Sequence, residues 1–149
     1  MEHIRIETRV EAPAEHVWAL YTDTSRWSDW MPRARFSDFS GPVDQAGTTY
    51  RSTMKTMGYE WNLTFKVLEV EPLKLIHEHT DDQGQQDNFI RFEPEGDATR
   101  LIVESDYEMP GHIPGPLKSL MTKSFFERQM RHMLGDFKTF AEASVPVPA

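Results

Sequence analysis

The sequence has no cysteine among its 149 residues, which excludes disulfides and thiolate chemistry. No apolar run approaches the roughly 20 residues that a membrane-spanning helix needs. The first ten residues alternate in polarity, so we expect no signal peptide. A reducing cytoplasm is the simplest compartment for such a chain, and we expect a cytoplasmic protein without a membrane span.

Positive charge is also scarce, because 16 Lys and Arg residues stand against 24 Asp and Glu residues, for a net charge of −8. No basic stripe offsets this excess, and a phosphate backbone repels such a surface. The sequence contains no phosphate-binding glycine loop, nucleotide fingerprint or Ser-His-Asp spacing. We therefore expect no nucleic-acid partner and no cofactor.

Turn signals divide the chain into runs of strand-like residues. The length fits one domain of ordinary size. The expected strands are 3–10, 34–40, 47–56, 60–71, 74–81, 86–94 and 98–108. The last six follow one another with short links, which predicts an antiparallel meander.

Helical patterns flank the strands. Residues 12–23 predict a short amphipathic helix, and a second short helix follows and closes before Pro32. Residues 116–143 predict a long helix, and 145–149 a flexible tail.

The apolar face of the long helix changes along its length. One stripe contains Phe126, Met130, Met133, Phe137 and Phe140, whereas Leu117, Leu120, Met121 and Phe125 lie on another side. The change indicates a kink, a pocket mouth or a second subunit, so a homodimer stays open. The Pro/Gly-rich loop 110–116 is either a gate or a plain connector.

Three stretches carry a family resemblance. They are "IETRVEAPAEHVWALYTDTSRWSDWMP", "RFEPEGDATRLIVESDYEMPG" and "LGDFKTFAE". Together with the element order, they resemble the START / polyketide cyclase-like (SRPBCC) superfamily, which includes the birch-pollen allergen. The resemblance spans almost the whole chain, and its motifs are structural ones.

The resemblance implies an α+β helix-grip fold over residues 1–144: a curved seven-stranded antiparallel sheet with two short helices and a long C-terminal helix packed over it. It also implies a cavity that binds lipids, sterols, quinones or polyketides, with a minority of members catalysing cyclisation, dehydration or hydrolysis. Trp27 and Trp30 would be wedges at one end of the sheet, or one indole would reach a ligand.

The alternation of side chains along each strand predicts which of them line that cavity. In 74–81 we assign the charged Lys74 and Glu78 to solvent, which turns His77 and His79 inward. The predicted ligand-binding residues are Tyr50, Met54, Trp61, Phe65, His77, His79, Asn88, Ile90, Phe92, Tyr107, Met121 and Phe125. Ser105 would be a further inward polar group. The same set would also suit a filled core, and a β-bulge would reverse the orientation of a strand.

His77 and His79 suggest two kinds of chemistry. A zinc site would need a third ligand, for which His112 is the evident candidate, and we assign no metal. Alternatively, His77, His79 or Tyr107 would act as a general acid or base. Three functions therefore stay open: a carrier or sensor of a hydrophobic or aromatic small molecule, a polyketide cyclase/dehydratase-like enzyme, and a protein-interaction module.

Overall fold

The computed structural model describes residues 1–56, 58–108, 115–118 and 121–144. Within these ranges the elements follow the predicted order. They are β1 (Glu2–Val10), α1 (Ala14–Thr22), the 3-10 turn η1 (Thr24–Arg26), α2 (Trp27–Trp30), β2 (Ala34–Ser37), β3 (Thr49–Thr56), β4 (Tyr59–Glu71), β5 (Leu75–Thr80), β6 (Gln86–Glu95), β7 (Ala98–Tyr107), α3 (Gly115–Lys118) and α4 (Lys123–Ala143).

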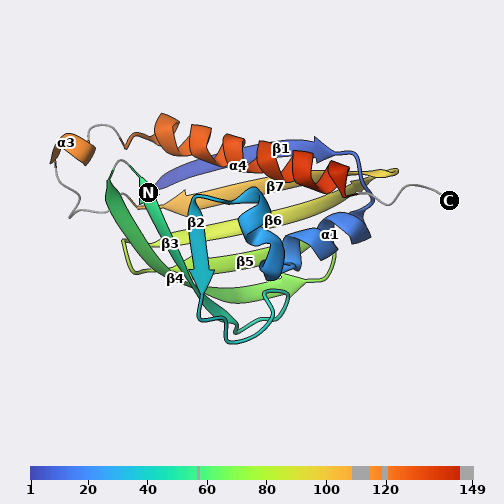
Figure 1. Cartoon of the computed structure of the whole chain (residues 1–149), viewed down its shortest axis with the longest axis horizontal. Helices are drawn as coiled ribbons and strands as arrows, with labels where there is room; N and C mark the ends of the chain where they lie inside the picture. Colours follow the sequence, from blue (N-terminus) through green and yellow to red (C-terminus); the bar gives the residue numbers. More distant parts are fainter. Residues whose placement is uncertain (57, 109–114, 119–120, 145–149) are drawn as a thin grey trace.

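The strands form one antiparallel sheet in the order β1-β7-β6-β5-β4-β3-β2. Strands β2 to β7 make the predicted meander, and β1 pairs with β7 at the other edge. Figure 1 shows α4 running along the curved sheet near β1, with α1 at one end of the molecule and α3 at the other. The predicted α+β helix-grip fold is confirmed.

The turn between β6 and β7 shows how local sequence sets the register. Gly96 has a positive φ of 65°, which glycine adopts at little cost. Glu95 and Ala98 pair across this two-residue connection. The same register pairs Ile90 with Val103, and both are buried in the core.

The long helix predicted over 116–143, whose changing apolar face indicated a kink, is interrupted at Met121 and Thr122. Helix α4 begins at Lys123, and the hydroxyl of Thr122 caps it by accepting the backbone N–H of Phe125 at 3.1 Å. A capped start separates α4 from α3, which explains why the apolar face changes. Leu120 and residues 110–114 of the proposed gate lie outside the described residues.

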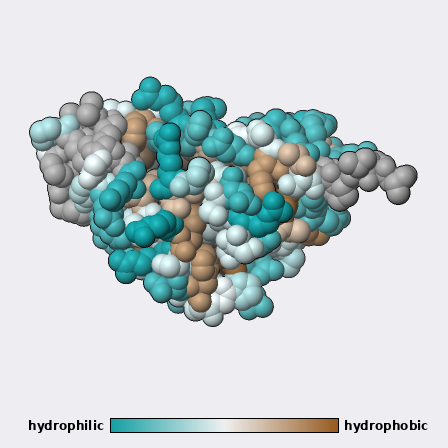
Figure 2. All heavy atoms as spheres, viewed as in Figure 1, coloured by the Kyte–Doolittle hydropathy of each residue, from teal (hydrophilic) through white to brown (hydrophobic). Residues whose placement is uncertain are grey.

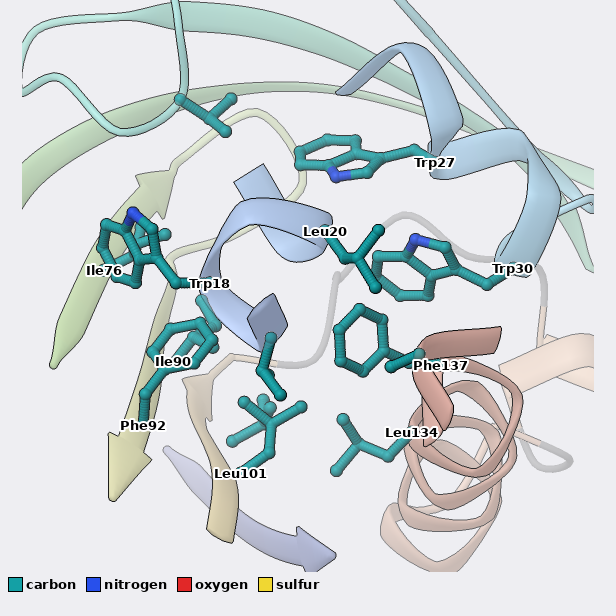
Figure 3. Packing of buried hydrophobic residues seen from close by; sticks show 14 of the residues in the cluster. Trp18, Leu20, Trp27, Trp30, Ile76, Ile90, Phe92, Leu101, Leu134 and Phe137 are labelled. Carbon is teal, nitrogen blue, oxygen red and sulfur yellow. The ribbon is translucent and has the colours of Figure 1, made fainter. Parts of the chain in front are cut away.

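Trp27 and Trp30 fill the corner between the short helices and α4. They are 4% and 2% exposed. The indole N–H of Trp27 donates to the backbone oxygen of Tyr21 at 2.7 Å. The ring of Trp30 meets Phe137 of α4 edge-on at 4.8 Å between centroids (Figure 3), a geometry worth about 0.5–1.5 kcal/mol beyond area burial. Both indoles are packed as wedges, as predicted, whereas contact of one indole with a ligand stays a prediction.

Strand β5 faces the opposite way from the prediction. Ile76 and Thr80 are each 2% exposed. Because side chains alternate along a strand, Glu78 lies on their inner face, and His77 and His79 lie on the outer face. The expectation that both histidines point inward is therefore wrong.

The assignment of every charged side chain to solvent caused this error. Val67 pairs with Glu78 and, after a bulge in β4, Val70 pairs with Ile76. Burying an isoleucine contributes about 1.5–3 kcal/mol, and a regular strand cannot turn one residue alone. The burial of Ile76 therefore sets the orientation of β5, and Glu78 points inward with it.

The outer surface is mostly polar. Figure 2 shows hydrophilic residues over most of one face, with narrow hydrophobic bands between them. In the described ranges the exposed large hydrophobic residues are Met1, Met54, Leu68 and Leu73. They belong to different segments, and the homodimer stays a prediction. No helix in the described part of the chain is long and apolar enough to span a membrane.

Candidate functional site

A cavity of about 480 Å³ lies between the inner face of the sheet and α4. Its walls are mainly aromatic and aliphatic side chains from the sheet, the short helices and α4. Cavities of roughly 300–1,000 Å³ with such walls and a few polar groups are typical of small-ligand sites.

Most of the predicted ligand-binding residues meet at this cavity. Tyr50, Met54, Trp61, Phe65, Asn88, Ile90, Tyr107 and Phe125 line it, and so does Ser105. The other predicted residues, His77, His79, Phe92 and Met121, are not part of its lining. The placement agrees with the predicted orientation of β3, β4, β6 and β7.

Phe92 and Met121 are core residues beside the cavity. The ring of Phe92 meets Trp18 and Tyr21 edge-on, at 5.0 and 5.6 Å between centroids. Met121 is buried and packs with Phe125 in a smaller cluster. Both therefore pack against residues that line the cavity.

The two histidines form a cluster on the outer face. Nε2 of His77 and Nδ1 of His79 lie 2.8 and 3.1 Å from the same oxygen, Oδ1 of Asp87. The ring of His77 also stacks on Phe89 at 4.2 Å. Among the described residues, no group of three or more His, Cys, Asp or Glu side chains could hold a metal ion. His112, the suggested third ligand, lies outside the described residues.

Glu78 is the polar centre of the cavity. The hydroxyl of Tyr50 donates a short hydrogen bond to its Oε2, and Nδ2 of Asn88 donates to its Oε1 at 3.1 Å. Nε2 of Gln86 donates to Oδ1 of Asn88 at 3.0 Å and lies 3.4 Å from Oγ of Ser105. These side chains form a continuous polar row from β3 to β7 on the sheet side of the cavity, which we call its floor.

Burial has the largest effect on the pKa values of the ionisable groups in and beside this row. It raises the pKa of the Glu78 carboxyl above its ordinary value, although the hydrogen bonds from Tyr50 and Asn88 and the nearby His77 oppose the shift. Burial and the charge of Glu78 likewise raise the pKa of Tyr50 and of Tyr21. Both tyrosines therefore stay protonated and can donate hydrogen bonds.

Two buried polar groups of the lining lack a hydrogen-bond partner among the described residues. They are the hydroxyl of Tyr107 and the indole N–H of Trp30. Burial, followed by the charges of Glu2 and Glu127, raises the pKa of Tyr107. Buried polar groups normally find partners, so a ligand with polar atoms would have two groups to engage.

Sequence reasoning missed Glu78 and Tyr21, among other lining residues. The signal for Glu78 was present, because Ile76 and Thr80 alternate with it and suit a buried face. Tyr21 lies on the first helix, α1, from which no lining residue was predicted.

Residues 1–142 match the family model described as polyketide cyclase / dehydrase and lipid transport. No curated protein matches the sequence.

Solved structures share the fold. TTHA0849 from Thermus thermophilus superposes with a TM-score of 0.74 at 19% identity, covering 97% of this chain and 100% of that one. A START superfamily protein from Mycobacterium smegmatis gives 0.74 at 18%, covering 96% and 99%. Norcoclaurine synthase from Thalictrum flavum, in complex with dopamine and hydroxybenzaldehyde, gives 0.70 at 17%, covering 98% and 89%. At these identities the likeness concerns the fold alone.

We expect replacement of Glu78 by Gln to stabilise the protein in a pH-dependent way. Because folding raises the pKa of Glu78, the native state disfavours the ionised carboxyl. The resulting loss of free energy of unfolding grows as pH rises from the ordinary carboxyl pKa of about 4.3 through the raised native pKa. Urea unfolding should therefore show a larger free energy of unfolding for Glu78→Gln than for wild type at about pH 8. The gain should shrink toward about pH 4.

Glu69→Gln is the matched control, since Glu69 is exposed on β4 and loses the same charge outside the cavity. A gain for Glu78→Gln that stays constant with pH, or grows in acid, would contradict the assigned shift.

Proposed function

The chain belongs to the polyketide cyclase / dehydrase and lipid transport family, and on that premise we propose that it binds one apolar or aromatic small molecule in the cavity beneath α4. The observation that carries this proposal is the cavity of about 480 Å³ with mainly apolar walls and a polar floor. A filled core would instead close such a space, because interiors pack as densely as organic crystals.

The polar groups support a ligand that is held in one orientation. Glu78 lies on the floor, and the unpartnered hydroxyl of Tyr107 belongs to the same lining. Apolar walls supply affinity in proportion to the area they bury, while a few polar groups select the ligand and its pose. Of the functions left open by the sequence, a carrier or sensor of a small hydrophobic molecule agrees best with this arrangement.

N-phenylnaphthylamine, an uncharged dye that fluoresces in apolar surroundings, tests the proposal. We expect one dye per chain, and we expect Leu63→Trp to weaken its binding by about tenfold or more. Leu63 lines the cavity from β4, so the larger side chain takes up space that the dye needs.

Leu68→Trp is the control, because Leu68 lies on the same strand and is 44% exposed. Dye binding that Leu63→Trp leaves unchanged, or that both variants weaken equally, would refute binding in the cavity.

A second candidate function is acid–base catalysis on a bound ligand, and Glu78 favours it. A carboxyl whose pKa is raised by burial is better suited to accept a proton near neutral pH than an exposed one. Glu78 would replace His77 and His79 in this role, since those side chains lie on the outer face. Tyr107 stays a candidate proton donor in the same cavity.

Hydrogen exchange of β-tetralone in D₂O, followed by proton NMR, tests this second function. If Glu78 removes a proton beside the carbonyl, wild type should accelerate exchange over buffer. Glu78→Gln should then lose roughly 10²–10⁴-fold of that acceleration, while His77→Ala should retain it. Exchange no faster than in buffer, or equal exchange by wild type and Glu78→Gln, would leave Glu78 with a binding role only.

A further inference from the structure

The hydrogen bonds around Glu78 suit a charged carboxylate. Oδ1 of Asn88 accepts from Gln86, which leaves the NH₂ group of Asn88 to donate to Glu78. Tyr50 donates to the other carboxyl oxygen. A carboxylate can accept about four hydrogen bonds, so Glu78 retains unused acceptor capacity.

No counter-ion accompanies this carboxylate in the described part of the chain, where no Lys, Arg or His side chain forms an ion pair with Glu78. His77 lies behind it on the outer face and contacts Asp87. The basic residues of the lining, Arg33 and His132, are both exposed, and His132 pairs with Asp136. Glu78 is half-buried in the cavity wall, and charges withdrawn from water are normally paired, so a cation from outside the chain would complete the site.

The walls around Glu78 are aromatic. The ring of Trp27 meets those of Tyr21 and Tyr50 edge-on, at 6.5 and 5.4 Å between centroids. All three rings line the cavity with Glu78. Because they pack against one another, they form an apolar wall beside the carboxylate. Carboxylate and rings together therefore suit a ligand with a charged end and an apolar body.

We propose that the cavity selects a ligand whose apolar body carries a protonated amine, with Glu78 as the counter-ion of the amine and the aromatic walls around the apolar body. The inference rests on the proposed binding function and narrows it to one ligand class. A fatty acid or another carboxylate is disfavoured, because its charge would repel that of Glu78.

Three probes with one scaffold test this selectivity: phenylbutylamine, phenylbutanol and phenylbutanoate. Calorimetric titration at about pH 8 keeps the alkylammonium charged. We expect wild type to bind the amine at least about tenfold more tightly than the alcohol, and to bind the carboxylate most weakly. Glu78→Gln should remove the preference for the amine and leave the affinity for the alcohol within about threefold. Glu69→Gln, the exposed control, should retain the preference.

Each other outcome overturns the inference in a recognisable way. If the alcohol binds wild type as tightly as the amine, or the carboxylate binds best, amine selection is refuted, while uptake of N-phenylnaphthylamine still supports the cavity. An amine preference that survives in Glu78→Gln also refutes the role of Glu78. If neither the dye nor any of the three probes binds, the proposed function fails together with this inference. The wild-type ranking needs no variant, so a folding defect in Glu78→Gln would not decide the result.

Discussion

The hydrogen bonds that Tyr50 and Asn88 donate to Glu78 hold a carboxyl inside a mainly apolar cavity. Burial of a carboxyl without partners is costly, so these donors are what makes the inward position tolerable. The position itself follows from the orientation of β5, whose neighbours Ile76 and Thr80 are buried on the same face. The packing of β5 thus places the carboxyl inside the cavity, and the proposed preference for an amine depends on that position.

The aromatic corner connects this site to the rest of the fold. The ring of Tyr21 contacts Trp27, Trp30, Phe92 and Phe137, and thereby joins α1, α2, β6 and α4. Trp27 and Trp30 wedge the corner and also face the cavity. Core and site share these side chains, so their packing holds the aromatic walls in place before a ligand arrives.

The order of elements and part of the cavity lining could be predicted because they follow from local patterns. Alternation placed Tyr50, Phe65 and Ile90 correctly, since each is a buried apolar residue followed by a basic residue on the outer face. It failed at Glu78, where the pattern of charge and the pattern of burial disagree and only the pairing with neighbouring strands decides. The start of α4 at Lys123 could not be located from the sequence, because the cap at Thr122 lies within a stretch that otherwise favours helix.

The family includes both transport and catalysis in its description, and the two share one requirement, a ligand that enters the cavity beneath α4. Backbone NMR of wild type titrated with N-phenylnaphthylamine tests that requirement most directly. The account predicts that chemical-shift changes concentrate at inner-face residues such as Tyr50, Phe65 and Ile90. Changes concentrated on the outer face, around His77 and Phe89, would contradict it.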